Sequence, residues 1–322
     1  IKSNFETLLT QYPSGMQVNS LLAAKNFGVS QRHILTGNGA AELIKALLEN
    51  LEGTLGIIRP TFEEYPNRYC TNDCVTFVPQ NDDLAYSADD VIEHFTHNKI
   101  RNLLIINPDN PSGNYISKED MIHLIDWAAK NKIQIIVDES FVDFADEKNN
   151  SLIHEKMLQQ FPNLVVIKSI SKSYGVPGLR LGVLASSNEA LIEKLKKDVA
   201  IWNINSFGEF YMQIEEKYHK DYLSALDKIR EVREEFINKL EMIKGIRVLP
   251  SQANFIMVEL INGKSSQEIT EKLLLAHNIF VKDLSGKISN KEKQYLRIAI
   301  RNEHDNCLLL KALNHVMNDS SE

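Results

Sequence analysis

Between about residue 53 and residue 186 the chain alternates short β-branched apolar segments with longer helix-patterned ones, and this alternation restricts the fold more than any other feature. A typical helix-patterned segment is Lys118–Lys130, whose apolar residues recur every three or four positions. The apolar segments are Thr54–Ile58, Val75–Val78, Leu103–Ile106, Ile133–Val137, Leu164–Ile167 and Leu181–Leu184. Parallel strands need crossover connections, usually helices, which cover both faces of the sheet. We therefore expect an α/β domain built on a mostly parallel central sheet.

The sequence after about residue 187 has a different pattern. Glu189–Val199 and Ile214–Ile243 are long, charged and helix-periodic, and they contain almost no glycine. They are followed by short apolar segments at Phe255–Val258, Ile279–Val281 and Tyr295–Ile300 and by a terminal helix at Cys307–Met317. This order predicts a smaller α+β domain. We expect an N-terminal arm, a large domain and a small C-terminal domain, spanning residues 1–14, 15–205 and 206–322.

Composition and charge exclude several classes of function. The net charge of -7 and the pI near 5.8 argue against a nucleic-acid binder, which would carry a basic surface. No apolar run approaches the roughly 18 residues of a membrane span, and the N-terminus lacks the pattern of a signal peptide. Three cysteines are too few for a disulfide framework, and the Cys70–Cys74 pair has no second pair at zinc spacing. We expect a cytoplasmic protein with small-molecule partners and no bound metal.

The scarce glycines concentrate near the expected carboxyl ends of strands. Six of the 14 glycines fall in three short segments, GNGAAEL at 37–43, NPDNPSG at 107–113 and SISKSYGVPGLRLG at 169–182. Asn107 and Asn110 directly follow one expected strand. Asp138 follows a second, and Lys172 lies just beyond a third. The carboxyl ends of parallel strands share one edge of a sheet, where open α/β sheets bind ligands, so we expect these side chains to converge there.

Each of these segments also has a purely structural interpretation. GNGAAEL is equally consistent with a capped loop and with a helix N-terminus that binds a phosphate. A dinucleotide-binding fingerprint is a poor interpretation, because the third glycine is missing and no clear strand precedes the segment. NPDNPSG has the composition of a turn, and Asp138 is also a suitable helix cap. The two Asn-Pro pairs, three residues apart after an apolar strand, favour the functional interpretation.

Lys172 has the surroundings of a cofactor-binding lysine. Ser169 and Ser171 precede it, and Arg180 follows it eight residues later. Two hydroxyls and an arginine bind a phosphate well, the arginine through paired hydrogen bonds. A lysine beside a bound phosphate cofactor is placed to act as a Schiff-base nucleophile. Lys168 is the competing lysine, but it ends the expected strand and lacks the glycine-rich surroundings.

Six motifs, taken together in order and spacing, resemble the class I/II aminotransferase family of fold-type I pyridoxal-phosphate (PLP) enzymes. The motifs are GNGAAEL, PTFEEY, NPDNPSG, VDESFVDF, SISKSYGVPGLRLG and YLRIAIRN, and they extend over nearly the whole chain. Within the family the chain is most similar to the branch of histidinol-phosphate aminotransferase and threonine-phosphate decarboxylase. The resemblance implies pyridoxal 5'-phosphate as the cofactor and a homodimer with shared active sites.

The resemblance also implies a role for each motif residue. Lys172 is expected to hold the cofactor and to move the proton at the substrate Cα, and Asp138 is expected to pair with the pyridine nitrogen. Asn110 is expected to donate to O3′ of the cofactor and Tyr65 to stack on its ring. Arg297 is expected to bind the substrate α-carboxylate. The expected phosphate ligands are the backbone amides of Gly39, Ala40 and Ala41, the side chains of Ser169, Ser171 and Arg180, and the partner subunit's Tyr12.

Three departures from the family pattern bear on the reaction. Phe141 stands where many members have a tyrosine whose hydroxyl contacts O3′, and it resembles the threonine-phosphate decarboxylase branch in this respect. Lys282 stands where that branch has an arginine that serves the substrate phosphate, and a lysine keeps the charge but loses the fork geometry. Family members also begin with a further segment, including Asn-x-Asn-Pro, that lines the site. We therefore expect this sequence to be a piece of a longer protein or of a fusion.

The main hypothesis is a PLP-dependent aminotransferase that acts on a small, phosphorylated amino acid with a 2-oxo acid as partner. The alternative is decarboxylation of a phosphorylated amino acid on the same scaffold, which Phe141, Pro177 and the AIRN segment favour. A third hypothesis is a non-catalytic PLP-binding or effector-binding domain of a fusion, and the joint presence of Lys172, Asp138 and Arg297 argues against it. No motif reports which bond at Cα is broken, so the sequence leaves the reaction open.

Overall fold

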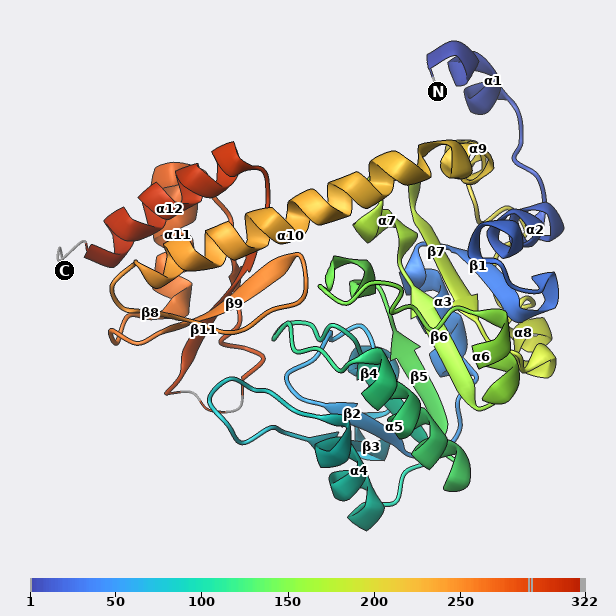
Figure 1. Cartoon of the computed structure of the whole chain (residues 1–322), viewed down its shortest axis with the longest axis horizontal. Coiled ribbons are helices and arrows are strands. Elements are labelled where there is room, and N and C mark those ends of the chain that lie inside the picture. Colours follow the sequence, from blue (N-terminus) through green and yellow to red (C-terminus); the bar gives the residue numbers. More distant parts are fainter. Residues whose placement is uncertain (1, 289, 291, 319–322) are drawn as a thin grey trace.

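The protein contains two sheets joined by a long helix, in a computed structural model that describes residues 2–288, 290 and 292–318 (Figure 1). The larger sheet has seven strands in the order β1-β7-β6-β5-β4-β2-β3. Their bounds are β1 Ile34–Asn38, β2 Leu55–Ile58, β3 Cys74–Phe77, β4 Asn102–Ile106, β5 Gln134–Asp138, β6 Leu164–Lys168 and β7 Leu181–Ala185. Neighbours from β3 to β6 are parallel, and β7 runs antiparallel to both β6 and β1. The expected α/β fold with a mostly parallel sheet is confirmed.

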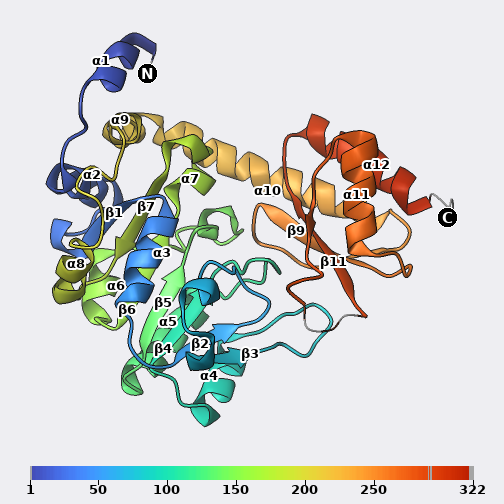
Figure 2. The same cartoon turned by 180° about the vertical axis from the view of Figure 1, so that it is seen from behind.

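Helices cover both faces of the larger sheet, as Figures 1 and 2 show from opposite sides. Successive side chains of a strand point to opposite faces, so each strand contributes to two cores. In β4, Leu103 and Ile105 pack with α2, α4, α5 and α6, whereas Leu104 and Ile106 pack with α3 and α8. The helices are α2 Met16–Phe27, α3 Ala40–Glu49, α4 Ala88–His97, α5 Lys118–Lys130, α6 Glu155–Gln160 and α8 Glu189–Leu195. Burial on both faces explains why these strands are continuous apolar runs in the sequence.

The strand β1 was missed from the sequence. It spans Ile34–Asn38 and runs into GNGAAEL, so the expectation that no clear strand precedes this segment is wrong. Only Ile34 and Leu35 form an apolar run, and the last two residues, Gly37 and Asn38, have low strand propensity. All five residues nevertheless pair with β7, from Ile34 opposite Ala185 to Asn38 opposite Leu181. β1 therefore depends on a long-range partner that no local pattern reveals.

The smaller sheet is antiparallel, with the order β10-β11-β9-β8. Its strands are β8 Ile246–Val248, β9 Phe255–Leu260, β10 Lys282–Asp283 and β11 Gln294–Ala299, and β10 begins just after the apolar segment in which a strand was expected. It packs against α11 Ser266–His277, α12 Glu303–Asn318 and the end of α10 His219–Glu241 through residues such as Phe236, Ile256 and Leu313. Figure 1 shows α10 extending from the larger sheet to the smaller one.

Two further helices precede α10. They are α1 Phe5–Thr10, near the N-terminus, and α9 Ser206–Ile214, which packs against α1 and α2. In the described part of the chain, no helix is both long and apolar enough to cross a membrane.

Candidate active site

The carboxyl ends of β4, β5 and β6 bring the candidate side chains to one edge of the larger sheet. β4 leads into the loop that holds Asn110, β5 ends at Asp138, and β6 leads into the short helix α7, Ile170–Ser173, which holds Lys172. These residues line a cavity of about 210 Å³. The lining residues are Ala40, Ala41, Ile44, Phe62, Ile106, Asn110, Asp138, Ser140, Phe141, Ser169, Lys172 and Arg180. The expected convergence at this edge is therefore present in the structure.

Lys172 presents its amine to this cavity, and no described residue forms a hydrogen bond or ion pair with it. Its Nζ lies 5.3 Å from the centroid of the Phe141 ring. Burial lowers the pKa of Lys172, and the positive charges of Arg297 and Arg180 lower it further, while Asp138 acts in the opposite direction. A lower pKa increases the fraction of neutral amine, which is the nucleophilic form. Lys168, by contrast, is buried and forms an ion pair with Asp143 at 2.7 Å, so its amine is engaged.

Asp138 presents a buried carboxylate to the cavity. Its Oδ1 accepts a hydrogen bond from the backbone N–H of Ser140 at 2.9 Å, and its Oδ2 accepts one from the Tyr65 hydroxyl at 2.8 Å. Burial raises the pKa of Asp138, and the hydrogen bonds from Ser140 and Tyr65 and the charge of Lys172 oppose this rise. Two donors thus orient the carboxylate, and a carboxylate held in this way can keep a proton on an aromatic ring nitrogen.

The N-terminus of α3 and the Arg180 guanidinium bring hydrogen-bond donors and positive charge to one end of the cavity. Ala40 and Ala41 are the first residues of α3, where backbone N–H groups have no partner within the helix. Gly39 has φ +73°, and a Cβ there would lie 2.4 Å from Arg180 Nη2. A Cβ at Gly182 would lie 2.4 Å from the backbone nitrogen of Ala40. Both glycines therefore permit the close approach of β7, Arg180 and the helix N-terminus.

Two expected phosphate ligands are engaged elsewhere. The N–H of Gly39 donates to the carbonyl of Arg180 at 2.8 Å. The Ser171 hydroxyl accepts from the Leu181 N–H at 2.9 Å and donates to the Leu181 carbonyl at 3.3 Å, so it holds α7 against β7. Ser169 does line the cavity, and its N–H donates to the hydroxyl of Ser140, a lining residue that the motifs did not single out. Of the expected phosphate-binding residues, the structure thus places Ala40, Ala41, Ser169 and Arg180 around the cavity.

The expected position of Tyr65 differs from the structure. Tyr65 is fully buried beneath the cavity with its hydroxyl on Asp138, and it does not line the cavity. Phe62, three residues earlier in PTFEEY, lines it instead and is 38% exposed. The two rings meet edge to face at 6.3 Å between centroids. The sequence does not distinguish Phe62 from Tyr65 in this respect, because the path of the loop decides which ring points into the cavity.

Tyr12 lies outside the cavity formed by its own chain. Its side chain is 80% exposed, and its ring packs on Trp202 with 4.8 Å between centroids. The role of Tyr12 at the neighbouring subunit's phosphate therefore stays a prediction.

The small domain supplies the remaining charges. Phe255 of β9 contacts Phe141 edge to face with 5.0 Å between ring centroids, and the guanidinium of Arg297 lies 5.1 Å from the Phe255 centroid. Arg297 Nη1 donates to Asn110 Oδ1 at 2.5 Å, which leaves the amide NH₂ of Asn110 to serve as a donor. Lys282 is directly opposite Arg297 in the β10–β11 ladder, so both side chains lie on the same face of the sheet.

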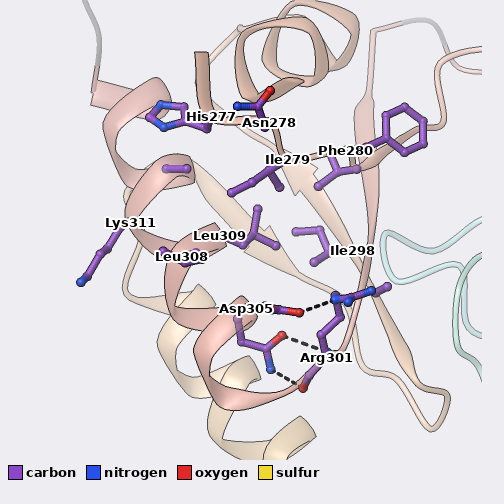
Figure 3. Close-up of a pocket in the computed structure, with 14 residues that line it drawn as sticks. His277, Asn278, Ile279, Phe280, Ile298, Arg301, Asp305, Leu308, Leu309 and Lys311 are labelled. Carbon is purple, nitrogen blue, oxygen red and sulfur yellow. Dashed lines mark hydrogen bonds and ion pairs between the residues drawn. The ribbon is translucent and has the colours of Figure 1, made fainter. Parts of the chain in front are cut away.

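A larger hollow, of about 670 Å³, lies within the small domain between α12, β11 and the segment before β10 (Figure 3). Its walls are largely apolar, with Ile279, Ile298 and Leu309 facing one another. Arg301 is paired with Asp305 at 2.7 Å, and Lys311 extends away from the hollow. The hollow therefore lacks the combination of free amine, carboxylate and anion-binding groups found at the edge of the larger sheet.

The fold and the cavity together define an α/β protein with a lysine pocket suited to a flat, phosphorylated aldehyde. Lys172 would supply the amine, Asp138 the partner for a ring nitrogen, the α3 N-terminus with Arg180 the phosphate-binding end, and Phe62 and Phe141 apolar surfaces. The chain belongs to the aminotransferase class I and II family, whose model matches residues 16–316. The residues present thus fit pyridoxal 5'-phosphate, on the evidence of their own donor and acceptor groups.

Known proteins of two activities are similar to the chain. It is 32% identical over 319 residues to L-serine phosphate decarboxylase from Campylobacter jejuni, covering 95% of this chain and 80% of that protein. The solved structure of a decarboxylase from Sulfurospirillum multivorans superposes with a TM-score of 0.89 at 30% identity, covering 99% of this chain and 82% of that one. Histidinol-phosphate aminotransferase from Clostridium acetobutylicum superposes with a TM-score of 0.85 at 26% identity, covering 98% and 94%.

Proposed function

We propose that this protein is a PLP-dependent decarboxylase of a phosphorylated amino acid, with O-phospho-L-serine as its substrate. The observation that carries the proposal is the similarity to L-serine phosphate decarboxylase over 95% of the chain. The presence of Phe141 in the cavity adds support, because it removes the tyrosine hydroxyl that many aminotransferases of the family carry at this position. The proposal thus follows the alternative drawn from the sequence rather than the main hypothesis.

The roles of the residues follow from their contacts. Lys172 would bind the cofactor covalently and later return a proton to the substrate Cα, while the Asp138 carboxylate would keep the ring nitrogen protonated. Ala40 and Arg180, with their neighbours at the α3 N-terminus, would bind the cofactor phosphate, and Arg297 would bind the substrate carboxylate. When bound, PLP supplies an electron sink for the bond broken at Cα.

Transamination is the second candidate, supported by the similarity to histidinol-phosphate aminotransferase. The two reactions differ in which bond at Cα lies perpendicular to the cofactor ring, and the groups that hold the far end of the substrate set that angle. The test is to incubate the PLP form with O-phospho-L-serine, O-phospho-L-threonine and L-histidinol phosphate. Released carbon dioxide and the pyridoxamine form of the cofactor are measured in each case.

We expect stoichiometric carbon dioxide from O-phospho-L-serine while the cofactor stays in its aldehyde form. Accumulation of the pyridoxamine form without carbon dioxide would instead establish transamination. The Lys172→Ala variant is the control and should show neither reaction. Borohydride reduction of the PLP form should attach the cofactor to the peptide that contains Lys172, and attachment to Lys168 would contradict the assignment.

We also propose a homodimer formed through the end of the molecule at α1 and α9. Phe5, Leu9, Tyr12, Ile201 and Trp202 are between 51% and 80% exposed there. Contacts between Phe5 and Phe207 and between Tyr12 and Trp202 connect this apolar group across the two chain segments. Apolar groups of this kind are characteristic of surfaces that bind another protein. A second copy would cover them and would bring the partner subunit's Tyr12 towards the phosphate-binding end.

A further inference from the structure

Lys287 is a positively charged side chain on the segment between β10 and β11, and it reaches the loop that precedes Phe62. After β10, a turn closed by the Lys287 N–H and the Leu284 carbonyl at 2.9 Å returns the chain towards the larger sheet. Lys287 Nζ then donates to the carbonyl of Thr61 at 2.9 Å. Thr61 directly precedes Phe62, which lines the cavity. Lys287 therefore connects this segment to the loop that carries Phe62, and its own side chain lines a neighbouring hollow of about 500 Å³ together with Arg59 and Lys293.

The charge of Lys287 lacks a carboxylate partner within the described residues. The Thr61 carbonyl is a neutral acceptor and uses one of the three N–H donors of the ammonium group. Glu63, a nearby acid, is engaged by Arg59, whose Nη1 donates to its two carboxylate oxygens at 2.7 and 2.8 Å. Lys287 thus has both a charge and hydrogen-bond donors available for an incoming anion.

Lys287 belongs to a cluster of like charges. Burial lowers its pKa, Glu63 opposes this, and the positive charges of Arg297, Lys282 and Arg59 lower it further. Arg297 in turn contacts Asn110 at the cavity, and Lys282 lies opposite Arg297 in the ladder. Neighbouring cations oppose one another until an anion binds among them. The arrangement suits a ligand with more than one negative charge.

We propose that Lys287 is a further ligand of the substrate phosphate, beside Lys282 and Arg297, whose roles at the phosphate and the α-carboxylate are those that the family resemblance implies; this assignment rests on the proposed function. A phosphate monoester carries a charge of about -1.5 to -2 near neutral pH and three acceptor oxygens, which two ammonium groups match. The bond from Lys287 to Thr61 also ties phosphate recognition to the loop that positions Phe62. Binding of the phosphate would thereby hold the two domains together over the cofactor.

The test compares dissociation constants of O-phosphoethanolamine and ethanolamine for the PLP form, followed through the absorbance of the cofactor. These ligands differ only in the phosphate and have no carboxylate to lose. Lys287→Met should weaken O-phosphoethanolamine roughly 10- to 100-fold, as the loss of a charged hydrogen bond implies, and leave ethanolamine within about twofold. Lys287→Arg should restore most of the affinity because it retains the charge.

Lys293→Met is the matched control. This lysine lies on the same segment but pairs with Asp82 at 2.6 Å and Glu259 at 3.6 Å, so neither affinity should change. Equal weakening of both ligands by Lys287→Met would overturn the assignment and leave the lysine as an interdomain contact, and no weakening would also overturn it. If the unsubstituted enzyme itself binds both ligands equally, the phosphorylated substrate of the proposed function is wrong as well. The two failures are thus distinguishable.

Discussion

Replacing Asp138 with asparagine removes its charge but keeps its size and hydrogen bonds, so the variant should lose activity without losing stability. The backbone N–H of Ser140 can still donate to the amide oxygen, and the Tyr65 hydroxyl can rotate to accept from the amide NH₂. The structural cost should therefore stay within about 1 kcal/mol. Because burial raises the pKa of Asp138, the carboxylate itself opposes folding, and the variant should keep or gain thermal stability.

The effect on catalysis should be much larger. An amide cannot supply the negative charge that keeps the ring nitrogen protonated, and a preorganised electrostatic contact of this kind contributes on the order of 3 kcal/mol or more. At about 1.4 kcal/mol per factor of ten, this predicts a fall in kcat of roughly 150-fold or more. The assay is carbon dioxide release from O-phospho-L-serine under saturating conditions, with cofactor occupancy and thermal unfolding measured on the same sample.

Tyr65→Phe provides the matched control for this prediction. It removes one hydrogen bond to the same carboxylate but keeps the charge, so it should lower kcat by about tenfold at most. Turnover of Asp138→Asn within threefold of the unsubstituted enzyme would refute the reasoning and leave Asp138 as a structural acid. An equal loss in both variants would assign the effect to geometry rather than charge.

Three further predictions concern the surroundings of the site. Burial raises the pKa of Asp109 from 3.8 to about 7, so between these pH values the folded protein holds a proton that the unfolded chain has lost, and the free energy of unfolding falls as pH rises. Asp109→Asn should flatten this pH dependence in denaturant unfolding and should be more stable than the unsubstituted protein at pH 8. An unchanged pH profile would contradict this prediction. Gly182→Ala places a Cβ 2.4 Å from the Ala40 nitrogen, so it should weaken PLP binding and lower the free energy of unfolding by about 1–3 kcal/mol, and normal cofactor affinity would exclude this packing argument. Sedimentation should show a dimer, and Tyr12→Ala should weaken its binding of PLP. A monomer with full activity would disprove the shared site.

The strands that the sequence predicted, and the positions of the residues that follow them, have a local signature. The strands of the larger sheet are buried on both faces, so they appear as continuous apolar runs whatever their neighbours are. The motif segments follow those strands directly, and chain connectivity alone places Asn110, Asp138 and Lys172 at one edge. The preference for Lys172 over Lys168 also follows from local surroundings, since Lys168 belongs to the strand β6. Local pattern and connectivity were sufficient here because the strands are parallel.

Only the tertiary structure shows which way a side chain points and which distant residues it contacts. Phe62 and Tyr65 are aromatics of one loop, and only the path of that loop turns the first into the cavity and the second beneath Asp138. Ser171 has the spacing of a phosphate ligand, yet its hydroxyl binds the backbone of a residue ten positions later. Lys287 meets the Thr61 carbonyl across 226 positions of sequence, a contact that exists only because the two domains close on each other. No periodicity encodes such contacts, because they arise from the packing of whole elements.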